Sequence, residues 1–133
     1  MINTVTLERD MTDFFADRLN LTTDSTIFRG AIPAGLDLGC ALRVTGIVPS
    51  DHNDNSMYSV QIYGKYRTRD EALNLIDSVA NCIPIYGEMT EHFKILFILP
   101  ESNFTAPVVI DDKGVSVQFA SVNLRVSVLT RQA

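Results

Sequence analysis

The chain has 133 residues and a formal net charge of -5, from 16 acidic and 11 basic side chains. This length suits a single domain, residues 1–133, and the acidic balance disfavours a broad phosphate-binding surface of the kind that grips nucleic acid. Hydrophobic residues make up 46% and charged residues 20%, which are ordinary globular values and disfavour a disordered chain.

The lack of a recognisable export signal and the isolated cysteines both indicate a reducing compartment. Met1–Arg9 has no basic stretch followed by an apolar core, and no run approaches the ~20 apolar residues that span a bilayer. We therefore expect neither export nor membrane insertion. Cys40 and Cys82 lie far apart without CxxC spacing, so we predict two buried thiols, with a disulfide between them as the alternative.

The first predicted element is a helix from about Val5 to Leu19. Its apolar residues recur at three- and four-residue steps on one face, namely Leu7, Met11, Phe14, Phe15 and Leu19. Thr4 or Thr6 is the predicted N-cap, and Glu8 and Asp10 suit the positive end of the helix dipole. The opposite face should be solvated, with Arg9, Asp13, Asp17 and Arg18.

Three strands with one hairpin are predicted next. Residues 20–39 form a polar connector with a minor strand at Thr26–Arg29. Cys40–Val48 is rich in β-branched residues and ends at Pro49, which cannot donate a ladder hydrogen bond. Tyr58–Tyr63 alternates apolar and polar residues, so this strand should bury one face and pair antiparallel with 40–48.

A second helix is predicted to begin at Arg69. Thr68 and Glu71 have the spacing of a capping box, and Pro84 should end the helix. The predicted stripe that packs on the sheet contains Ala72, Ile76, Val79, Ala80 and Ile83.

The rest of the chain predicts a very apolar strand and a C-terminal hairpin. Phe93–Leu99 should have both faces covered, one by helices and the other by a neighbouring subunit. Val108–Ile110 and a strand from Val115 flank a turn at Asp111–Gly114. The apolar residues of the last strand switch from odd to even positions, which predicts a bulge near Ala120 or a strand that enters a second contact.

Together these elements predict an α+β fold with a mixed, mainly antiparallel sheet, two main helices packed on one face and a long C-terminal hairpin.

The sequence offers few residues for catalysis or metal binding. Asp51, His52 and Asp54 could face a cation, but their segment lacks the glycine and distal glutamate of a calcium loop, so we interpret it as a solvated loop. His92 stands beside Glu91, near Glu88, where a general acid or base can be imagined; we interpret it as a surface histidine at a strand edge. No catalytic residue, cofactor or metal ligand is assigned, and we expect the chain not to be an enzyme.

Three charged segments are interpreted as protein interfaces. Lys65, Arg67 and Arg69 form the only local basic cluster, at the start of the second helix. The candidate contact residues are Asp51, His52, Asp54, Lys65, Arg67, Arg69, Asp111, Asp112 and Lys113.

The segment YSVQIYGKYRTRDEALNLI, residues 58–76, resembles the centre of tail terminator and related minor capsid proteins of long-tailed bacteriophages. In that family an N-terminal amphipathic helix precedes a strand of the type xVQIxxR, and a charged residue with alanine follows at a helix start. The matching residues are Val60, Gln61, Ile62, Glu71 and Ala72. The arginine that directly follows the strand in the family is displaced here, with Lys65 and Arg67 nearby.

The resemblance implies a subunit of a hexameric ring that caps the tail tube, stops its polymerisation and docks to the head–tail connector protein. Its partners would be copies of itself, the tail tube protein and the connector. Such a protein is made in the host cytoplasm and resides in the virion tail or neck, with DNA only as passing cargo and no membrane contact. The alternatives are another neck, head-completion or tail-tube subunit, and a small ligand-binding or metal-dependent enzyme domain that uses His52 or His92.

Overall fold

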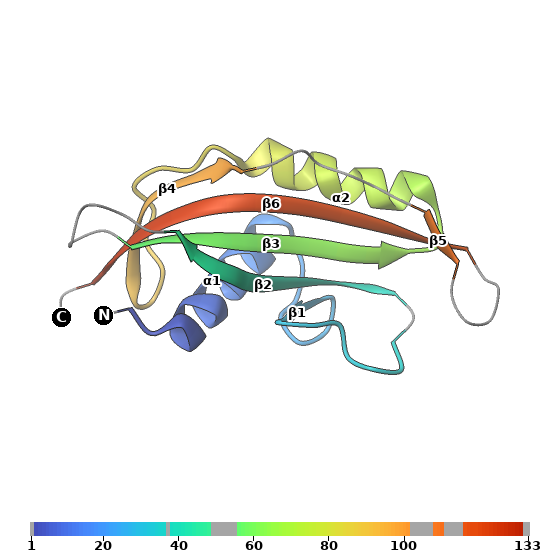
Figure 1. The fold of residues 1–133 in the computed structure, drawn as a ribbon, viewed down its shortest axis with the longest axis horizontal. Helices are drawn as coiled ribbons and strands as arrows, with labels where there is room; N and C mark the ends of the chain where they lie inside the picture. The colour runs from blue at the N-terminus through green and yellow to red at the C-terminus, as the bar shows by residue number, and fades with distance from the viewer. Residues whose placement is uncertain (1, 37, 49–55, 102–107, 111–115, 132–133) are drawn as a thin grey trace.

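The computed structural model describes residues 2–36, 38–48, 56–101, 108–110 and 116–131 (Figure 1). The elements in chain order are α1 (Thr4–Arg18), β1 (Ile27–Arg29), β2 (Gly39–Val48), β3 (Ser56–Tyr66), α2 (Arg69–Cys82), β4 (Phe93–Pro100), β5 (Val108–Ile110) and β6 (Ser116–Thr130). The predicted α+β class is confirmed. No helix in this part of the chain combines the length and hydropathy needed to cross a bilayer.

A single sheet joins all the strands in the order β1-β2-β3-β6-β4, and β5 pairs with the start of β6. β1 runs parallel to β2, and the other pairs are antiparallel. β3 and β6 are long and lie at the centre (Figure 1). The sheet is therefore mixed and mainly antiparallel, as predicted, and the C-terminal hairpin is the β5–β6 pair.

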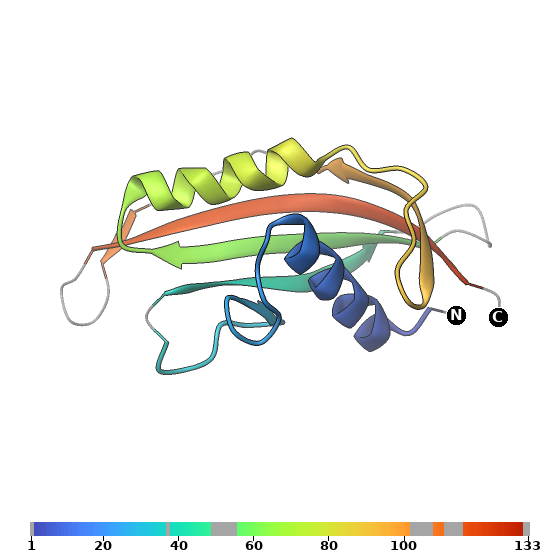
Figure 2. The same cartoon turned by 180° about the vertical axis from the view of Figure 1, so that it is seen from behind.

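Both helices pack on one face of this sheet, α1 against β1 and β2, and α2 against β3 and β6 (Figure 2). Alternate residues of each strand point toward the helices, which gives the period-two pattern seen in the sequence. Fully buried side chains from both helices and five strands form one core, including Leu7, Met11, Phe15, Ile27, Leu42, Ile62, Val79, Ile98, Val122 and Leu124. The helices thus leave the opposite face of the sheet to other contacts.

The start of α1 differs from the prediction. Its N-cap is Asn3, whose Oδ1 accepts a hydrogen bond of 3.1 Å from the backbone N–H of Thr6, so neither Thr4 nor Thr6 caps the helix. Asparagine caps as well as threonine does, and only the backbone path selects between adjacent candidates. Neither Glu8 nor Asp10 lies in the first turn, so the predicted role at the positive end of the dipole is wrong for both: Asp10 is buried, and Oε2 of Glu8 accepts a hydrogen bond of 3.0 Å from the N–H of Val44.

The start of α2 confirms the predicted cap. The Thr68 hydroxyl oxygen accepts a hydrogen bond of 3.2 Å from the N–H of Glu71 and donates one of 2.9 Å to the Glu71 carboxylate. The helix ends at Cys82, because Ile83 before Pro84 adopts extended geometry with φ -111° and ψ 152°. Ile83 is therefore the C-cap and not part of the helical stripe.

The predicted bulge near Ala120 is wrong. β6 pairs with β3 in unbroken register from Gln118 to Val128, and the register shifts lie instead in β2 and β4. The apolar pattern of β6 switches because its early residues Val117 and Phe119 occupy the helix-free face, whereas Val122 and later even positions face the helices. A change in which face is apolar, without a slip of the strand, explains the sequence pattern.

Candidate functional site

The helix-free face of the sheet carries a chain of polar contacts across its three central strands. Nε of Arg43 on β2 donates a hydrogen bond of 2.7 Å to Oε1 of Gln61 on β3. Nε2 of Gln61 in turn donates one of 2.8 Å to Oγ of Ser121 on β6. The Arg43 guanidinium also lies 5.2 Å from the centroid of the Tyr63 ring. These contacts link polar side chains of β2, β3 and β6 in one row across the helix-free face.

An apolar margin adjoins this polar centre. Met57 on β3 and Phe97 on β4 flank Ser127 of β6 from its two sides, and Leu99 on β4 lies opposite Arg125 of β6. All of these side chains are on the helix-free side of the sheet. Leu129 joins them opposite Lys94. The four apolar side chains of this margin are only partly buried. A partly exposed apolar margin beside a polar centre has the composition of a surface that packs against another protein.

Charge is divided between the two layers of the molecule. The strands contain basic side chains and no acidic ones, namely Arg29, Arg43, Lys65, Lys94 and Arg125. Pairing puts all but Arg29 on the helix-free face; Arg29 faces α1, where its Nε lies 3.9 Å from Oε1 of Glu8. The two helices carry an excess of acid, with Glu8, Asp10, Asp13, Asp17, Asp70, Glu71 and Asp77 against Arg9, Arg18 and Arg69. Among the described residues, the strands of the helix-free face are therefore mainly basic and the helices acidic, although Glu101 also reaches the helix-free face, where its Oε1 accepts a hydrogen bond of 3.0 Å from Oγ of Ser59.

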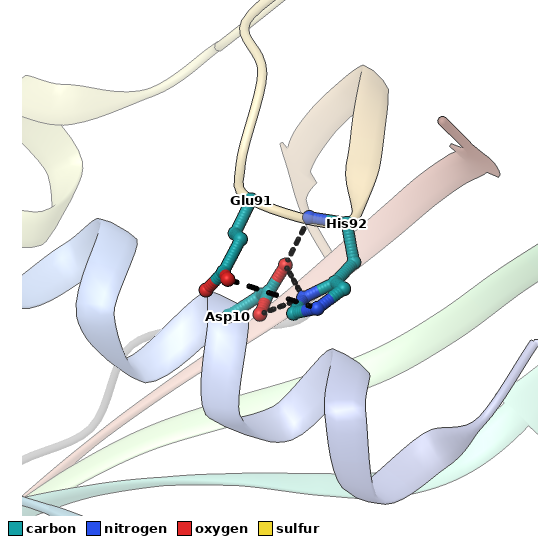
Figure 3. A group of neighbouring side chains, drawn as sticks. All are labelled: Asp10, Glu91 and His92. Carbon is teal, nitrogen blue, oxygen red and sulfur yellow. Dashed lines mark hydrogen bonds and ion pairs between the residues drawn. The ribbon is translucent and has the colours of Figure 1, made fainter. Parts of the chain in front are cut away.

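A second cluster joins α1 to the start of β4 (Figure 3). The side chain of Asp10 is 2% exposed, and its Oδ2 accepts hydrogen bonds from the Thr90 hydroxyl at 2.7 Å and from the backbone N–H of His92 at 2.8 Å. Nδ1 of His92 lies 3.0 Å from Oδ1 of Asp10, and Nε2 lies 3.9 Å from Oε1 of Glu91. A buried carboxylate is thus paired with a half-exposed imidazole.

This geometry determines what the imidazole can do. Because the Asp10 carboxylate accepts at Nδ1, that nitrogen carries the proton in neutral His92, and Nε2 is left as an acceptor or ligand. In a hydrolytic triad, Nε2 would face a hydroxyl or thiol nucleophile. Here the neighbour of Nε2 is the Glu91 carboxylate and not a hydroxyl or thiol, so this arrangement does not suit acyl transfer.

His92 is on the surface, as the sequence predicted, but its main partner was missed. Glu88, which stands near it in sequence, pairs with Arg18 at 2.8 Å. The partner is Asp10, and one signal pointed to it: Asp10 interrupts the apolar stripe three residues after Leu7. A carboxylate on the buried face of a helix requires a partner across the packing interface.

The predicted contact residues fall into two groups. Lys65 lies at the end of β3 on the helix-free face, and Arg67 and Arg69 are exposed at the β3–α2 turn. Within the described part of the chain, neither Lys65 nor Arg67 forms an ion pair. The remaining candidates, Asp51, His52, Asp54, Asp111, Asp112 and Lys113, lie outside the described residues.

The two cysteines are free thiols, so the disulfide alternative is not found. Cys40 is buried in the core, and burial raises the pKa of its thiol from 9.0 to about 12. Cys82 is only partly buried, and its thiol donates a hydrogen bond of 3.2 Å to the carbonyl oxygen of Ser78. The prediction of two buried thiols therefore holds fully for Cys40 alone.

Comparison with known proteins adds no relative to these observations. No protein-family model matches the sequence, and a search of curated proteins finds no match.

Proposed function

We propose that this chain is a structural assembly subunit that associates with copies of itself. The observation that carries the proposal is the division of charge, because the basic helix-free sheet face of one copy complements the acidic helix layer of the next. The partly exposed Met57, Phe97, Leu99 and Leu129 add apolar area beside the basic side chains. Electrostatic attraction between the two faces and burial of the apolar margin would both favour association of the copies.

A contact between two different faces is heterologous, and it generates a closed ring when the rotation between neighbours closes. A contact between two identical sheet faces would instead bring Arg43, Lys65 and Arg125 of one copy against the same residues of the other. Like charges placed opposite one another oppose association. The charge pattern therefore favours a ring over a face-to-face dimer.

The specific assembly that we propose is the hexameric ring of a phage tail terminator, resident in the virion. It would cap the tail tube, dock to the head–tail connector protein and let DNA pass. Support comes from the resemblance carried by Val60, Gln61 and Ile62, which lie in β3, and by Glu71 and Ala72, which lie in the first turn of α2. Another neck or tube subunit is the alternative, and negative-stain images distinguish closed rings from tubes.

Light scattering coupled to size separation tests the self-association. We expect oligomers whose mass grows with protein concentration and which dissociate as sodium chloride screens the charges. Arg125→Glu reverses an exposed charge on the sheet face, and we expect it to weaken association at least tenfold. Arg125 is preferred to Arg43 for this test because Arg43 also holds Gln61 in place.

The matched control is Arg9→Glu, which makes the same change of charge on the exposed surface of α1. Since it adds acid to the acidic layer, association should be unchanged or stronger. A protein that stays monomeric from micromolar to millimolar concentration at low salt would contradict the proposal. Equal weakening by both variants would contradict the assignment of the two faces.

A further inference from the structure

Three potential metal ligands from two segments that lie far apart in the sequence converge beside α1. The ligand atoms of Asp10, Glu91 and His92 all lie within 4.8 Å of one another (Figure 3). Imidazole nitrogen with carboxylate oxygens is a donor set that suits Zn²⁺ and similar transition-metal ions, whereas Ca²⁺ and Mg²⁺ prefer oxygen alone.

The Asp10 carboxylate is held in place before any ion arrives. Its Oδ2 is fixed by the Thr90 hydroxyl and the His92 backbone N–H, at 2.7 and 2.8 Å. Outer hydrogen bonds of this kind orient a metal ligand and strengthen binding, because little side-chain freedom is lost when the ion is bound. Oδ1 is left to face the imidazole.

The spacing of the first two ligands matches that of neighbours around one ion. Oδ1 of Asp10 and Nδ1 of His92 are 3.0 Å apart. Two ligands at about 2.1 Å from a zinc ion, about 90–110° apart, lie about 3.0–3.4 Å from each other. An ion could therefore replace the hydrogen bond between these atoms with little movement of either side chain.

Glu91 supplies the third ligand, and nearby carboxylates make the surroundings of the site negative. Its side chain is 81% exposed, so the carboxylate, whose Oε1 now lies 3.9 Å from Nε2 of His92, can rotate toward the Nδ1 side of the ring, where the ion would lie. Asp10 and Glu91 line a recess of about 260 Å³ together with Asp13 and Asp17. Four carboxylates around one recess create a negative potential that concentrates cations there.

We propose that Asp10, Glu91 and His92 form a binding site for a divalent transition-metal ion of the Zn²⁺ type. Three protein ligands leave at least one coordination position open to water or to a partner's side chain. The site lies on the helix side of the molecule, within the acidic layer that meets the basic sheet face of the next copy in the proposed assembly.

Titration of the full chain with zinc chloride, followed by calorimetry, tests the site. We expect one ion per chain, and at least tenfold weaker binding in Glu91→Gln and His92→Asn. His92→Asn is chosen because an amide can keep a hydrogen bond to Asp10 while it removes the imidazole ligand. The absorption spectrum of bound Co²⁺ gives a second measurement, and its ligand-field bands should disappear in His92→Asn.

Two control variants separate ligation from other effects. Asp17→Asn removes one charge of the recess wall without removing a ligand, so its binding should change much less than that of Glu91→Gln. His52→Ala removes the other histidine of the chain and should leave binding unchanged. The proposal is overturned if the wild-type chain shows no saturable binding at micromolar zinc, if His52→Ala abolishes binding, or if His92→Asn binds as the wild type does.

Discussion

The backbone N–H of His92 donates a hydrogen bond of 2.8 Å to the carboxylate of Asp10, across 82 positions of the chain. The same segment is held from its other side by Arg131, whose N–H donates to the His92 carbonyl oxygen at 2.9 Å and whose guanidinium donates to that of Thr90 at 2.7 Å. Residues 90–92 are thus fastened to α1 and to the end of β6 at once. This junction connects the beginning, middle and end of the described chain.

Asp10→Asn should destabilise the protein, because the amide has one oxygen where the carboxylate has two, so its NH2 group must replace the acceptor either of the His92 ring or of the Thr90 hydroxyl and the His92 N–H. Leaving buried donors without an acceptor costs about 1–3 kcal/mol of the free energy of unfolding. Urea denaturation followed by circular dichroism measures this. Asp17→Asn changes an exposed carboxylate on the same helix and should stay within about 0.5 kcal/mol. Similar losses in both variants would show that the Asp10 contacts contribute little.

Gly64→Ala should destabilise the sheet–helix packing. A Cβ at Gly64 would lie 2.8 Å from Cδ2 of Leu75 and would collide with the ring of Tyr66. Overpacking of this kind costs about 1–3 kcal/mol. The control is Gly46→Ala, where no atom lies within 4 Å of the added Cβ, and its melting temperature should match the wild type. A wild-type melting temperature in Gly64→Ala would mean that α2 moves aside freely.

The stability of the protein should fall in alkaline solution, partly through Cys40. Burial raises the pKa of this thiol from 9.0 to about 12, so above pH 9 the unfolded chain releases a proton that the folded chain keeps. The contribution is fully present below pH 9 and is lost as the pH rises toward 12, by about 1.4 kcal/mol at pH 10.

Cys40→Ala tests this assignment through the slope of stability against pH, since its absolute stability also reflects the lost side chain. Denaturant midpoints between pH 8 and pH 10 should decline less steeply in Cys40→Ala than in the wild type. Cys82→Ala is the comparison, because that thiol is much less buried and should contribute less. Equal slopes in the wild type and Cys40→Ala would rule out the buried thiol as the cause.

Thr68→Ala should weaken the start of α2 by removing the oxygen that accepts from the N–H of Glu71. The expected loss is about 1 kcal/mol in the free energy of unfolding. Thr68→Ser keeps the hydroxyl and should restore nearly all of it. A serine variant as unstable as the alanine variant would point to the threonine methyl group and away from the cap.

The sequence by itself determined the secondary structure, because helices, strands and caps depend on neighbours within a few residues. The capping box at Thr68, the strand stopped before Pro49 and the alternation from Tyr58 to Tyr63 are local signals of this kind. The same signals could not choose Asn3 over Thr4 as a cap. They also could not distinguish a bulge in β6 from a strand whose apolar residues switch from the helix-free face to the face that the helices cover. Each of those outcomes depends on what packs against the segment.

Only the tertiary structure decided which side chains meet. Asp10 and His92 are brought together because α1 packs beside the start of β4, and no periodicity within either segment encodes that distance. Likewise, Arg43, Gln61 and Ser121 form one row because the register of two strand pairs aligns them. The division between a basic sheet face and an acidic helix layer arises in the same way, since strands distribute side chains to two faces and only packing decides which face the helices cover.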